Sequence, residues 1–209
     1  MAQEEQKKLV SRIKVKKKFW FKIIAPKSFG HRELGETYLT APETAVGRKV
    51  SITLKEITGN VKDQNAYVHF AIVGAQGGKL MTSLLGYSLT PSYVRRAVKK
   101  NVDRLDDQMI LSTKEGKKFV LKSLMVTVHK TKRSIRSMLR KQLQAGLQEE
   151  AGTMDFENLV SSVVFQKLQQ SLRKKLSKVY PLRELAIRAL LLQDIPETTT
   201  ETVPEAPLP

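Results

Sequence analysis

The sequence contains no cysteine among its 209 residues, which excludes disulfide bonds, thiolate metal sites and cysteine nucleophiles. The absence of cysteine also indicates a reducing compartment. No apolar run reaches the roughly 18 residues that a membrane-spanning helix needs. Residues 1–6 are polar and acidic, unlike a signal peptide. We therefore expect a cytoplasmic protein without a membrane partner.

Acidic residues are scarce relative to basic ones. The chain has 37 Lys and Arg against 20 Asp and Glu, a formal net charge of +17. An apolar content of 41% is enough to build a core, so a folded protein carries this charge, and a polyanionic partner is its simplest explanation. Aromatic residues make up only 6%, which argues against a protein that binds single strands mainly by base stacking.

The charge is divided into segments. Residues 7–22 and 116–148 contain no acid, whereas residues 194–209 contain no Lys or Arg. Acid-free basic elements held on one fold repel one another unless phosphates neutralise them, which predicts nucleic-acid binding. No zinc finger, zipper or recognition-helix motif is present, and basic arms typically order on folded RNA, so RNA is favoured over DNA.

This segmentation predicts three parts of the chain. Residues 1–18 form a basic N-terminal arm, and residues 194–209 form a disordered acidic tail that is rich in Thr and Pro. Between them, residues 19–193 form a single RNA-binding body. We expect this body to be strand-rich over 19–128 and helix-rich over 129–193.

Five short segments have the alternation or the β-branched and aromatic content of strands. They are residues 50–54, 67–73, 80–85, 109–112 and 118–128. Glycine-containing turns at 74–79 and 114–116 join two pairs of them as hairpins. The pattern predicts an α+β protein, in which an antiparallel β-sheet or small β-barrel forms the core and helices lie at its periphery.

Helices are predicted between and after these strands. Thr90-Pro91 is a helix start, because a hydroxyl cap precedes proline at the first helical position. The apolar positions of this helix share one face: Val94, Ala97, Val98 and Val102. A second helix is predicted over about 134–147. A third helical region begins near Phe156 and stops at Pro181, and Ser161-Ser162 could break it. Residues 182–192 fit either a helix or a buried strand.

No residue pattern typical of catalysis is present. The three histidines, His31, His69 and His129, are far apart and lack metal-ligand spacing. We expect His69 to be a partly buried structural residue of a strand. Residues 74–79 resemble a phosphate-binding loop only superficially, because Leu80 stands where a magnesium-binding hydroxyl is required.

The only dense acids of the body are Asp103, Asp106 and Asp107. They follow the helix that begins at Thr90-Pro91, and we expect them to cap or solvate its end rather than bind a metal. The sequence therefore predicts no enzymatic activity, no catalytic residue, no metal and no cofactor.

Basic residues of the arm, of the first helix and of the second helix are predicted to contact RNA phosphates. They are Lys14, Lys16, Lys17, Lys18, Lys22, Arg95, Arg96, Lys99, Lys100, Lys130, Lys132, Arg133, Arg136, Arg140 and Lys141. Lys132, Arg136 and Arg140 recur every four residues and would form one stripe. We expect Arg136 and Arg140 to be exposed and to contribute little to folding. The neighbouring Phe19-Trp20-Phe21 is predicted to anchor the arm in the core rather than to stack on bases.

Several short motifs lie in an order that resembles a known family. They are Trp20-Phe21-Lys22-Ile23-Ile24-Ala25-Pro26, Phe29, Arg32, Gly35, Thr37, Gly86-Tyr87-Ser88-Leu89-Thr90, Val98-Lys99-Lys100, Lys130-Thr131-Lys132-Arg133, Ile135-Arg136 and Val179-Tyr180-Pro181-Leu182. In this order they resemble the S-three-Ae (e-S-one) family of archaeal and eukaryotic small-subunit ribosomal proteins. The chain is shorter than the eukaryotic members, and an acidic tail replaces their C-terminal extension, which implies an archaeal source.

The resemblance implies an α+β fold with a β-barrel-like core, on the platform of the small subunit near the messenger exit. It implies binding to small-subunit (16S) ribosomal RNA near its 3′ end, contact with neighbours such as the S-eleven type, and proximity to mRNA. It also implies a strand for residues 182–192 and no catalytic residues.

Two other functions share part of this pattern. A free RNA-binding translation or RNA-processing factor would have the same charge, but it would bind RNA away from ribosomes. Sedimentation with 30S particles distinguishes it from a ribosomal component. An enzyme acting on nucleic acid would need a carboxylate cluster for metal, for which the three aspartates are the only candidates.

Overall fold

The computed structural model describes residues 17–193. The strands are β1 (Phe19–Ile24), β2 (Glu33–Leu39), β3 (Lys49–Thr53), β4 (Ala66–Gln76), β5 (Lys79–Leu89), β6 (Arg104–Ser112), β7 (Lys118–Thr127) and β8 (Leu182–Leu192). The α-helices are α2 (Leu54–Thr58), α3 (Pro91–Ala97), α4 (Arg133–Thr153), α5 (Phe156–Val164) and α6 (Lys167–Leu176), and short 3-10 helices span Lys27–Phe29, Pro42–Ala45 and Val61–Asn65. The predictions for residues 1–16 and for the tail at 194–209 lie outside the described residues.

The strands form one eight-stranded mixed sheet. Its order is β2-β1-β5-β8-β7-β6, and β4 pairs with both β3 and β5. All pairs are antiparallel except β1 with β5. The predicted α+β class is confirmed. Over residues 17–193, β2 and β3 do not pair, so β1–β5 form a curved, open sheet rather than a barrel closed by hydrogen bonds.

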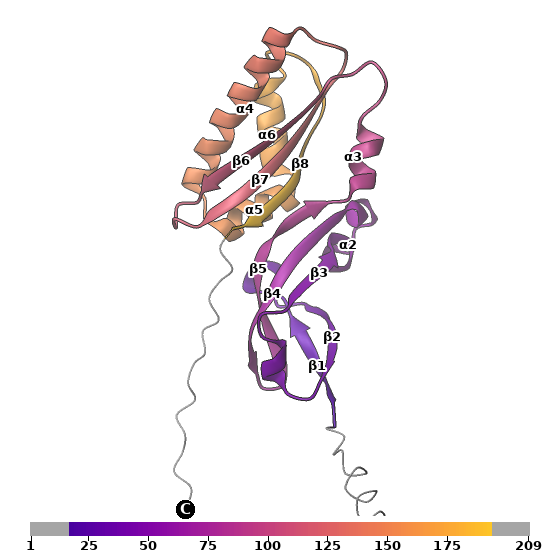
Figure 1. Ribbon diagram of the computed structural model, residues 1–209, viewed down its shortest axis with the longest axis vertical. Helices are drawn as coiled ribbons and strands as arrows, with labels where there is room; N and C mark the ends of the chain where they lie inside the picture. Colours follow the sequence, from indigo (N-terminus) through magenta and orange to yellow (C-terminus); the bar gives the residue numbers. More distant parts are fainter. Residues whose placement is uncertain (1–16, 194–209) are drawn as a thin grey trace, which may run out of the picture.

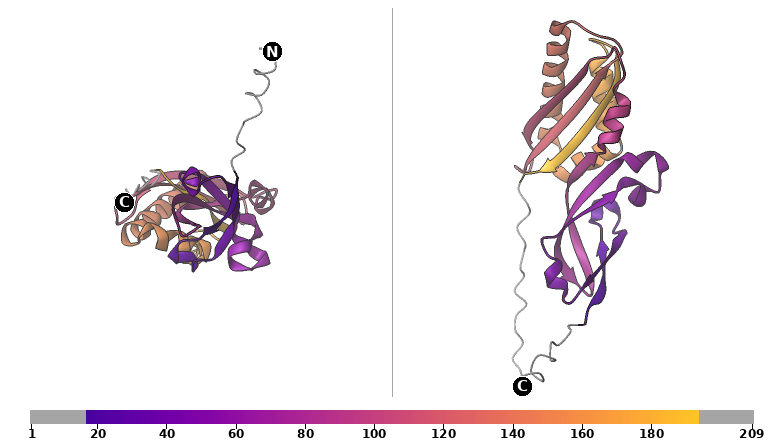
Figure 2. Two further views of the ribbon diagram at one scale, coloured as in Figure 1. Left: turned by 90° about the horizontal axis from the view of Figure 1, so that it is seen from below. Right: turned by 45° about the vertical axis from the view of Figure 1, so that its right-hand side comes forward.

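Strand β5 joins the two ends of an elongated molecule (Figure 1). Along one edge it pairs with β4, whereas along the other edge residues 79–81 pair with β1 and residues 86–88 pair with β8. β1–β5 therefore form one end of the molecule, and β6–β8 with α4, α5 and α6 form the other, as the second view also shows (Figure 2).

The helices cover the two faces of β6–β8 unequally. α4, α5 and α6 lie on one face, where buried leucines of α4 and α6 pack with Leu121 and Met125 of β7. The short α3 lies on the opposite face, where Val94 packs with Leu124 and Val126. Alternate residues of a strand point to opposite faces, so β7 supplies apolar side chains to both. Its burial on both faces explains why it reads as a nearly continuous apolar run.

All five predicted strands are present and most are longer than predicted. The β4–β5 turn is only Gly77-Gly78, because the strands continue to Gln76 and from Lys79. Both glycines have positive φ angles, 57° and 78°, as a two-residue hairpin turn requires. Residues 182–192 form strand β8, as the family resemblance implied.

The helix boundaries differ more from the predictions. Thr90 caps α3 as predicted, since its hydroxyl accepts from the Tyr93 amide at 3.4 Å, but α3 ends at Ala97, so Val98 and Val102 lie beyond it. The second helix, α4, extends to Thr153. The third region breaks at Gln166, whose φ of 58° is left-handed, and not at Ser161-Ser162.

Candidate nucleic-acid interface

Three connecting segments meet at the end of the molecule where α4 begins and α6 ends (Figure 1). Asp103, which precedes β6, accepts hydrogen bonds at Oδ2 from the Thr131 amide (2.6 Å) and hydroxyl (2.9 Å). The amide of Val128 donates to the carbonyl of Pro181 at 3.3 Å. These bonds fasten the loops that follow α3, β7 and α6 to one another, although they are far apart in the sequence.

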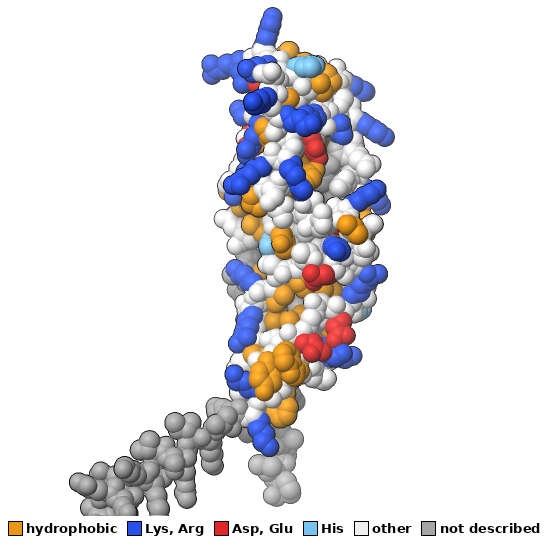
Figure 3. All heavy atoms as spheres, turned by 90° about the vertical axis from the view of Figure 1, so that its right-hand side faces the viewer, with side chains coloured by type: hydrophobic (Ala, Val, Ile, Leu, Met, Phe, Trp, Pro, Cys, Tyr) orange, Lys and Arg blue, Asp and Glu red, His pale blue; other side chains and the backbone are white. Residues whose placement is uncertain are grey.

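This end carries many exposed cations. We use "basic end" for the residues Lys99, Lys100, Lys130, Lys132, Arg133, Lys174, Lys175 and Lys178, all of which are exposed. Within residues 17–193, none of them takes part in an ion pair. Lys and Arg side chains dominate the corresponding half of the surface in Figure 3.

The start of α4 adds to the positive potential of the basic end. The first turn of α4 contains no acid, and its N-cap, Lys132, makes no side-chain capping bond. A helix N-terminus has free amide groups and a partial positive charge, so acids are favoured there and cations are not. Placing Lys132 and Arg133 at this position is unfavourable in the free protein and suits a bound anion such as phosphate.

Asp103 is the acid of this region, and it is held by Thr131. The two hydrogen bonds from Thr131 lower the pKa of Asp103. The carboxylate thus joins two loops, and the eight cations of the basic end have no acidic partner within residues 17–193. The local structure keeps the loops together despite their like charges.

The predicted stripe of Lys132, Arg136 and Arg140 on α4 is not uniformly exposed to solvent. Arg136 is half-buried, and its Nε atom is buried without a hydrogen-bond partner in the described part of the chain. Arg140 Nε lies 3.0 Å from Asp107 Oδ1 of β6. Leu143 is buried on this side of the helix, which turns Arg136 and Arg140 toward the sheet. Arg140 is exposed as predicted but takes part in an ion pair, and the expectation that Arg136 is exposed is wrong. Lys132 and Lys141 are exposed.

Replacement of Arg140 by Ala is expected to destabilise the protein at neutral pH by about 1 kcal/mol, the value of a partly exposed ion pair. Burial raises the pKa of Asp107 and Arg140 opposes this rise. The folded state therefore binds the Asp107 proton more readily than the unfolded state, and stability falls as pH increases through this pKa. The loss caused by R140A should shrink in acid, where Asp107 is protonated. Urea unfolding of both proteins at several pH values measures this difference in the free energy of unfolding.

The double variant R140A/D107N provides the control for this ion pair. If the pair acts as described, the two substitutions together should cost less than the sum of the single losses. Additive losses with no pH dependence would show that Arg140 stabilises α4 in another way.

The predicted RNA-binding residues therefore divide into several places. Lys99, Lys100, Lys130, Lys132 and Arg133 come together at the basic end. Arg95 and Arg96 lie on α3, where Arg96 Nη2 donates to Asn65 Oδ1 at 2.5 Å. Lys17, Lys18 and Lys22 lie at the opposite end, on and before β1. Lys14 and Lys16 lie outside the described residues.

Lys174, Lys175 and Lys178 were missed by the sequence analysis. Their run near the end of α6 was visible, but Lys174 follows Arg133, the preceding member of the basic end, by 41 positions in the sequence. Only the contact of residue 181 with residue 128, and the pairing of Leu182 with Thr127, brings them to the basic end.

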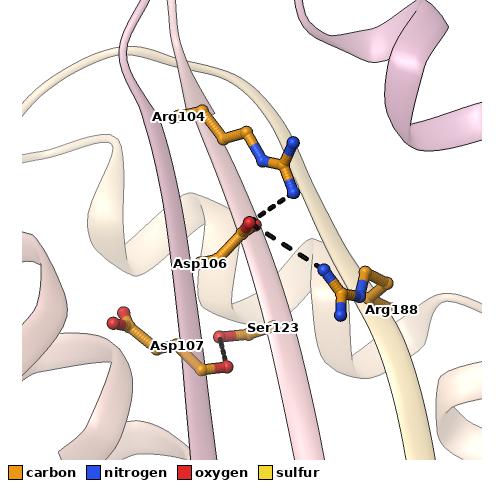
Figure 4. Close-up of polar contacts among 5 residues, drawn as sticks. All are labelled: Arg104, Asp106, Asp107, Ser123 and Arg188. Atoms are coloured by element: carbon orange, nitrogen blue, oxygen red, sulfur yellow. Dashed lines mark hydrogen bonds and ion pairs between the residues drawn. The ribbon is translucent and has the colours of Figure 1, made fainter. Parts of the chain in front are cut away.

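The remaining polar clusters are structural. Asp106 and Asp107 belong to β6 and not to a helix end, which corrects the prediction for them. Asp106 pairs with Arg104, and lies 3.9 Å from Arg188 Nη1, on one face of the sheet, whereas Asp107 points toward the other face (Figure 4). No group of acids, histidines or cysteines able to hold a metal is found in residues 17–193.

His69 is a partly buried structural residue, as predicted. It lies on β4, between the hydroxyls of Ser51 and Ser88, each 2.7 Å from a ring nitrogen. Burial lowers the pKa of His69, which favours the neutral ring. The ring thus links β4 to Ser51 of β3 and to Ser88 of β5.

The prediction for Phe19-Trp20-Phe21 is wrong for two of its members. Phe19 is 58% exposed and Trp20 is 65% exposed. Phe21 alone packs, half-buried, against the small core around Ile23 and Leu80.

The described helices include none long and apolar enough to cross a membrane.

Eight exposed cations lie around a helix N-terminus, and within residues 17–193 none of them takes part in an ion pair. This arrangement is typical of proteins that bind a polyanion. The sequence profile of the Ribosomal S3Ae family matches residues 5–195. The chain belongs to this family, which confirms the resemblance noted in its motifs.

Relatives of similar length extend the comparison. The small ribosomal subunit protein eS1 of Sulfurisphaera tokodaii is 32% identical over 183 residues, which cover 88% of this chain and 95% of the relative. The protein of the same name from Methanothermobacter thermautotrophicus is 31% identical over 172 residues, covering 82% and 88%. That from Saccharolobus solfataricus is 28% identical over 190 residues, covering 91% of each chain.

Family membership confirms the class predicted from the sequence. The chain is an archaeal-type ribosomal protein of the small subunit, located with the ribosome in the cytoplasm, and it is not an enzyme.

Proposed function

We propose that this protein is a structural constituent of the small ribosomal subunit that binds small-subunit ribosomal RNA through its basic end. The observation that carries the proposal is the meeting of eight exposed cations, without acidic partners in the described chain, around the N-terminus of α4. Lys and Arg neutralise phosphates and position the protein, whereas the shape of the folded RNA supplies specificity.

The proposal includes a position in the subunit. Val98-Lys99-Lys100 and Lys130-Thr131-Lys132-Arg133 are motifs of the family resemblance, and they supply five residues of the basic end. On that resemblance the protein lies at the platform near the messenger exit, close to mRNA, beside a neighbour such as the S-eleven type. The arm, with Lys14, Lys16, Lys17 and Lys18, adds phosphate contacts, and the acidic tail at 194–209 stays clear of RNA because phosphate repels it.

Binding to a fragment of 16S ribosomal RNA should depend steeply on salt. Each neutralised phosphate releases counterions, so about 8 phosphate contacts give a slope of log K against log salt near −6 to −7. Titration of labelled RNA at several salt concentrations measures this slope. A slope shallower than about −2 would contradict binding through phosphates.

A further inference from the structure

Two exposed aromatic rings lie on the outer surface of β1 and β2, at the end of the molecule opposite the basic end. Trp20 lies directly across from Tyr38 in the antiparallel pair. Their ring centroids are 5.0 Å apart with an angle of 36° between the rings. Trp20 is 65% exposed and Tyr38 is 50% exposed. The two rings therefore contact each other outside the hydrophobic core, and much of the Trp20 ring is accessible to solvent. Figure 3 shows hydrophobic side chains gathered at this end of the surface.

Lysines border the two rings. Residues two apart on a strand share a face, so Lys18 and Lys22 lie on either side of Trp20. Lys18 Nζ lies 5.7 Å from the centroid of the Tyr38 ring, within the range of a cation–π contact. Lys22 pairs with Glu33 at 2.8 Å, and Lys79 lies beside Lys22 across the β1–β5 pair. Over residues 17–193, Lys18 and Lys79 make no ion pair.

We propose that this aromatic face, made of Lys18, Trp20, Lys22, Tyr38 and Lys79, binds an unpaired nucleobase of the RNA. The base stacks on Trp20, and Lys18 holds an adjoining phosphate. The inference rests on the proposed function, because it assigns a second contact to the same RNA. Stacking of bases on aromatic rings between lysines is the chemistry by which proteins hold single-stranded segments.

The surroundings of the aromatic face favour RNA over a protein partner. A stable protein interface buries about 800 Å² on each partner around an apolar centre. Here the exposed large apolar side chains on this side of the hairpin are Trp20 and Tyr38. Charged residues lie next to them along the strands: Lys18 at one end, Lys22 with Glu36 at the other. The sequence that leads into Lys17 is also basic, with Lys7, Lys8, Arg12, Lys14 and Lys16, so phosphates are attracted to this end.

Tryptophan fluorescence tests the proposal directly, because Trp20 is the only tryptophan of the chain. The full-length protein is titrated with a single-stranded RNA oligonucleotide and with an abasic phosphodiester oligomer of the same length. Both should bind through lysines, but only the oligonucleotide with bases should quench Trp20. A fluorescent label on each oligomer measures binding separately by anisotropy.

Variants connect the quenching to affinity. W20L keeps an apolar side chain but removes the ring, and it should weaken binding of the single-stranded oligonucleotide by about 5- to 100-fold, the effect of one stacked base. Binding of duplex RNA should be unchanged. The control is F165L, since Phe165 is 64% exposed between α5 and α6 and lies away from this face. F165L should change neither measurement.

The possible results separate this inference from the proposed function. If anisotropy shows salt-dependent RNA binding but Trp20 is not quenched and W20L binds normally, the aromatic face is not a nucleobase site and the proposed function stands. If a purified small-subunit protein, and no RNA, changes Trp20 emission, the face is a protein interface and the inference is overturned. Absence of any RNA binding would overturn both.

Discussion

Replacing Lys99, Lys100, Lys130 and Lys132 together by Gln should weaken binding to 16S ribosomal RNA by roughly 10³-fold at moderate salt, if each lost charge-assisted contact costs about 1 kcal/mol. The slope of log K against log salt should become shallower by about 3, because each lost phosphate contact removes between about 0.7 and 0.9 from it. Labelled RNA in a salt titration measures both values. Folding should be preserved, since all four side chains are exposed and free of ion pairs within residues 17–193.

A matched control separates the position of the charge from its amount. Lys55, Lys62, Lys114 and Lys118 are also exposed, and their replacement by Gln removes the same four charges from other surfaces. This variant should lose only the weaker, long-range attraction, and its salt slope should stay close to that of the unmodified protein. If both variants lose affinity and slope equally, RNA is bound by the diffuse field of the protein and the basic end is not an interface.

Local patterns in the sequence predicted five of the eight strands, because the interactions that form them are local, whereas β1 and β2 were not predicted. Alternation of apolar residues identified β3, aromatic and β-branched content identified β4, and a short apolar run after a glycine turn identified β5. The Thr90 hydroxyl and Pro91 identified the start of α3. The end of α3 and the break at Gln166 were missed. No residue type marks either boundary, since Val98 and Gln166 can both be accommodated in a helix. The two boundaries therefore depend on how neighbouring segments pack.

The candidate interface was predicted in its parts but not as a surface. Basic segments are visible in the sequence, but which of them meet depends on the path of the chain. Arg136 and Arg140 were expected to be exposed because of their spacing. The packing of α4 against β6 leaves Arg136 half-buried and places the exposed Arg140 beside Asp107. Trp20 was expected in the core because of its apolar ring. One face of β1 is exposed to solvent, and Trp20 lies on that face across from Tyr38.

Replacing Gly86 by Ala should destabilise the protein more than any other single substitution considered above. Gly86 lies where β5 pairs with His69 of β4 on one side and with Leu191 of β8 on the other. A Cβ atom at this position would lie 2.0 Å from the carbonyl oxygen of Leu190 and 3.0 Å from the Leu191 Cα. The obstructing atoms belong to the backbone, so a side-chain rotation cannot relieve the clash. β5 and β8 would have to separate at the contact that joins the two ends of the molecule.

The expected loss is about 3 kcal/mol or more, at the upper end of the range for overpacked sites. For a protein of this size, that corresponds to a fall of roughly 6–12 °C in the unfolding midpoint, which calorimetry measures. The control is Gly74 of β4, where nothing lies within 4 Å of the position of a Cβ atom. G74A should stay within about 0.5 kcal/mol of the unmodified protein. Similar midpoints for G86A and G74A would mean that β8 can move away from β5 at little cost, and the two ends of the molecule would then be joined less firmly than their shared strand indicates.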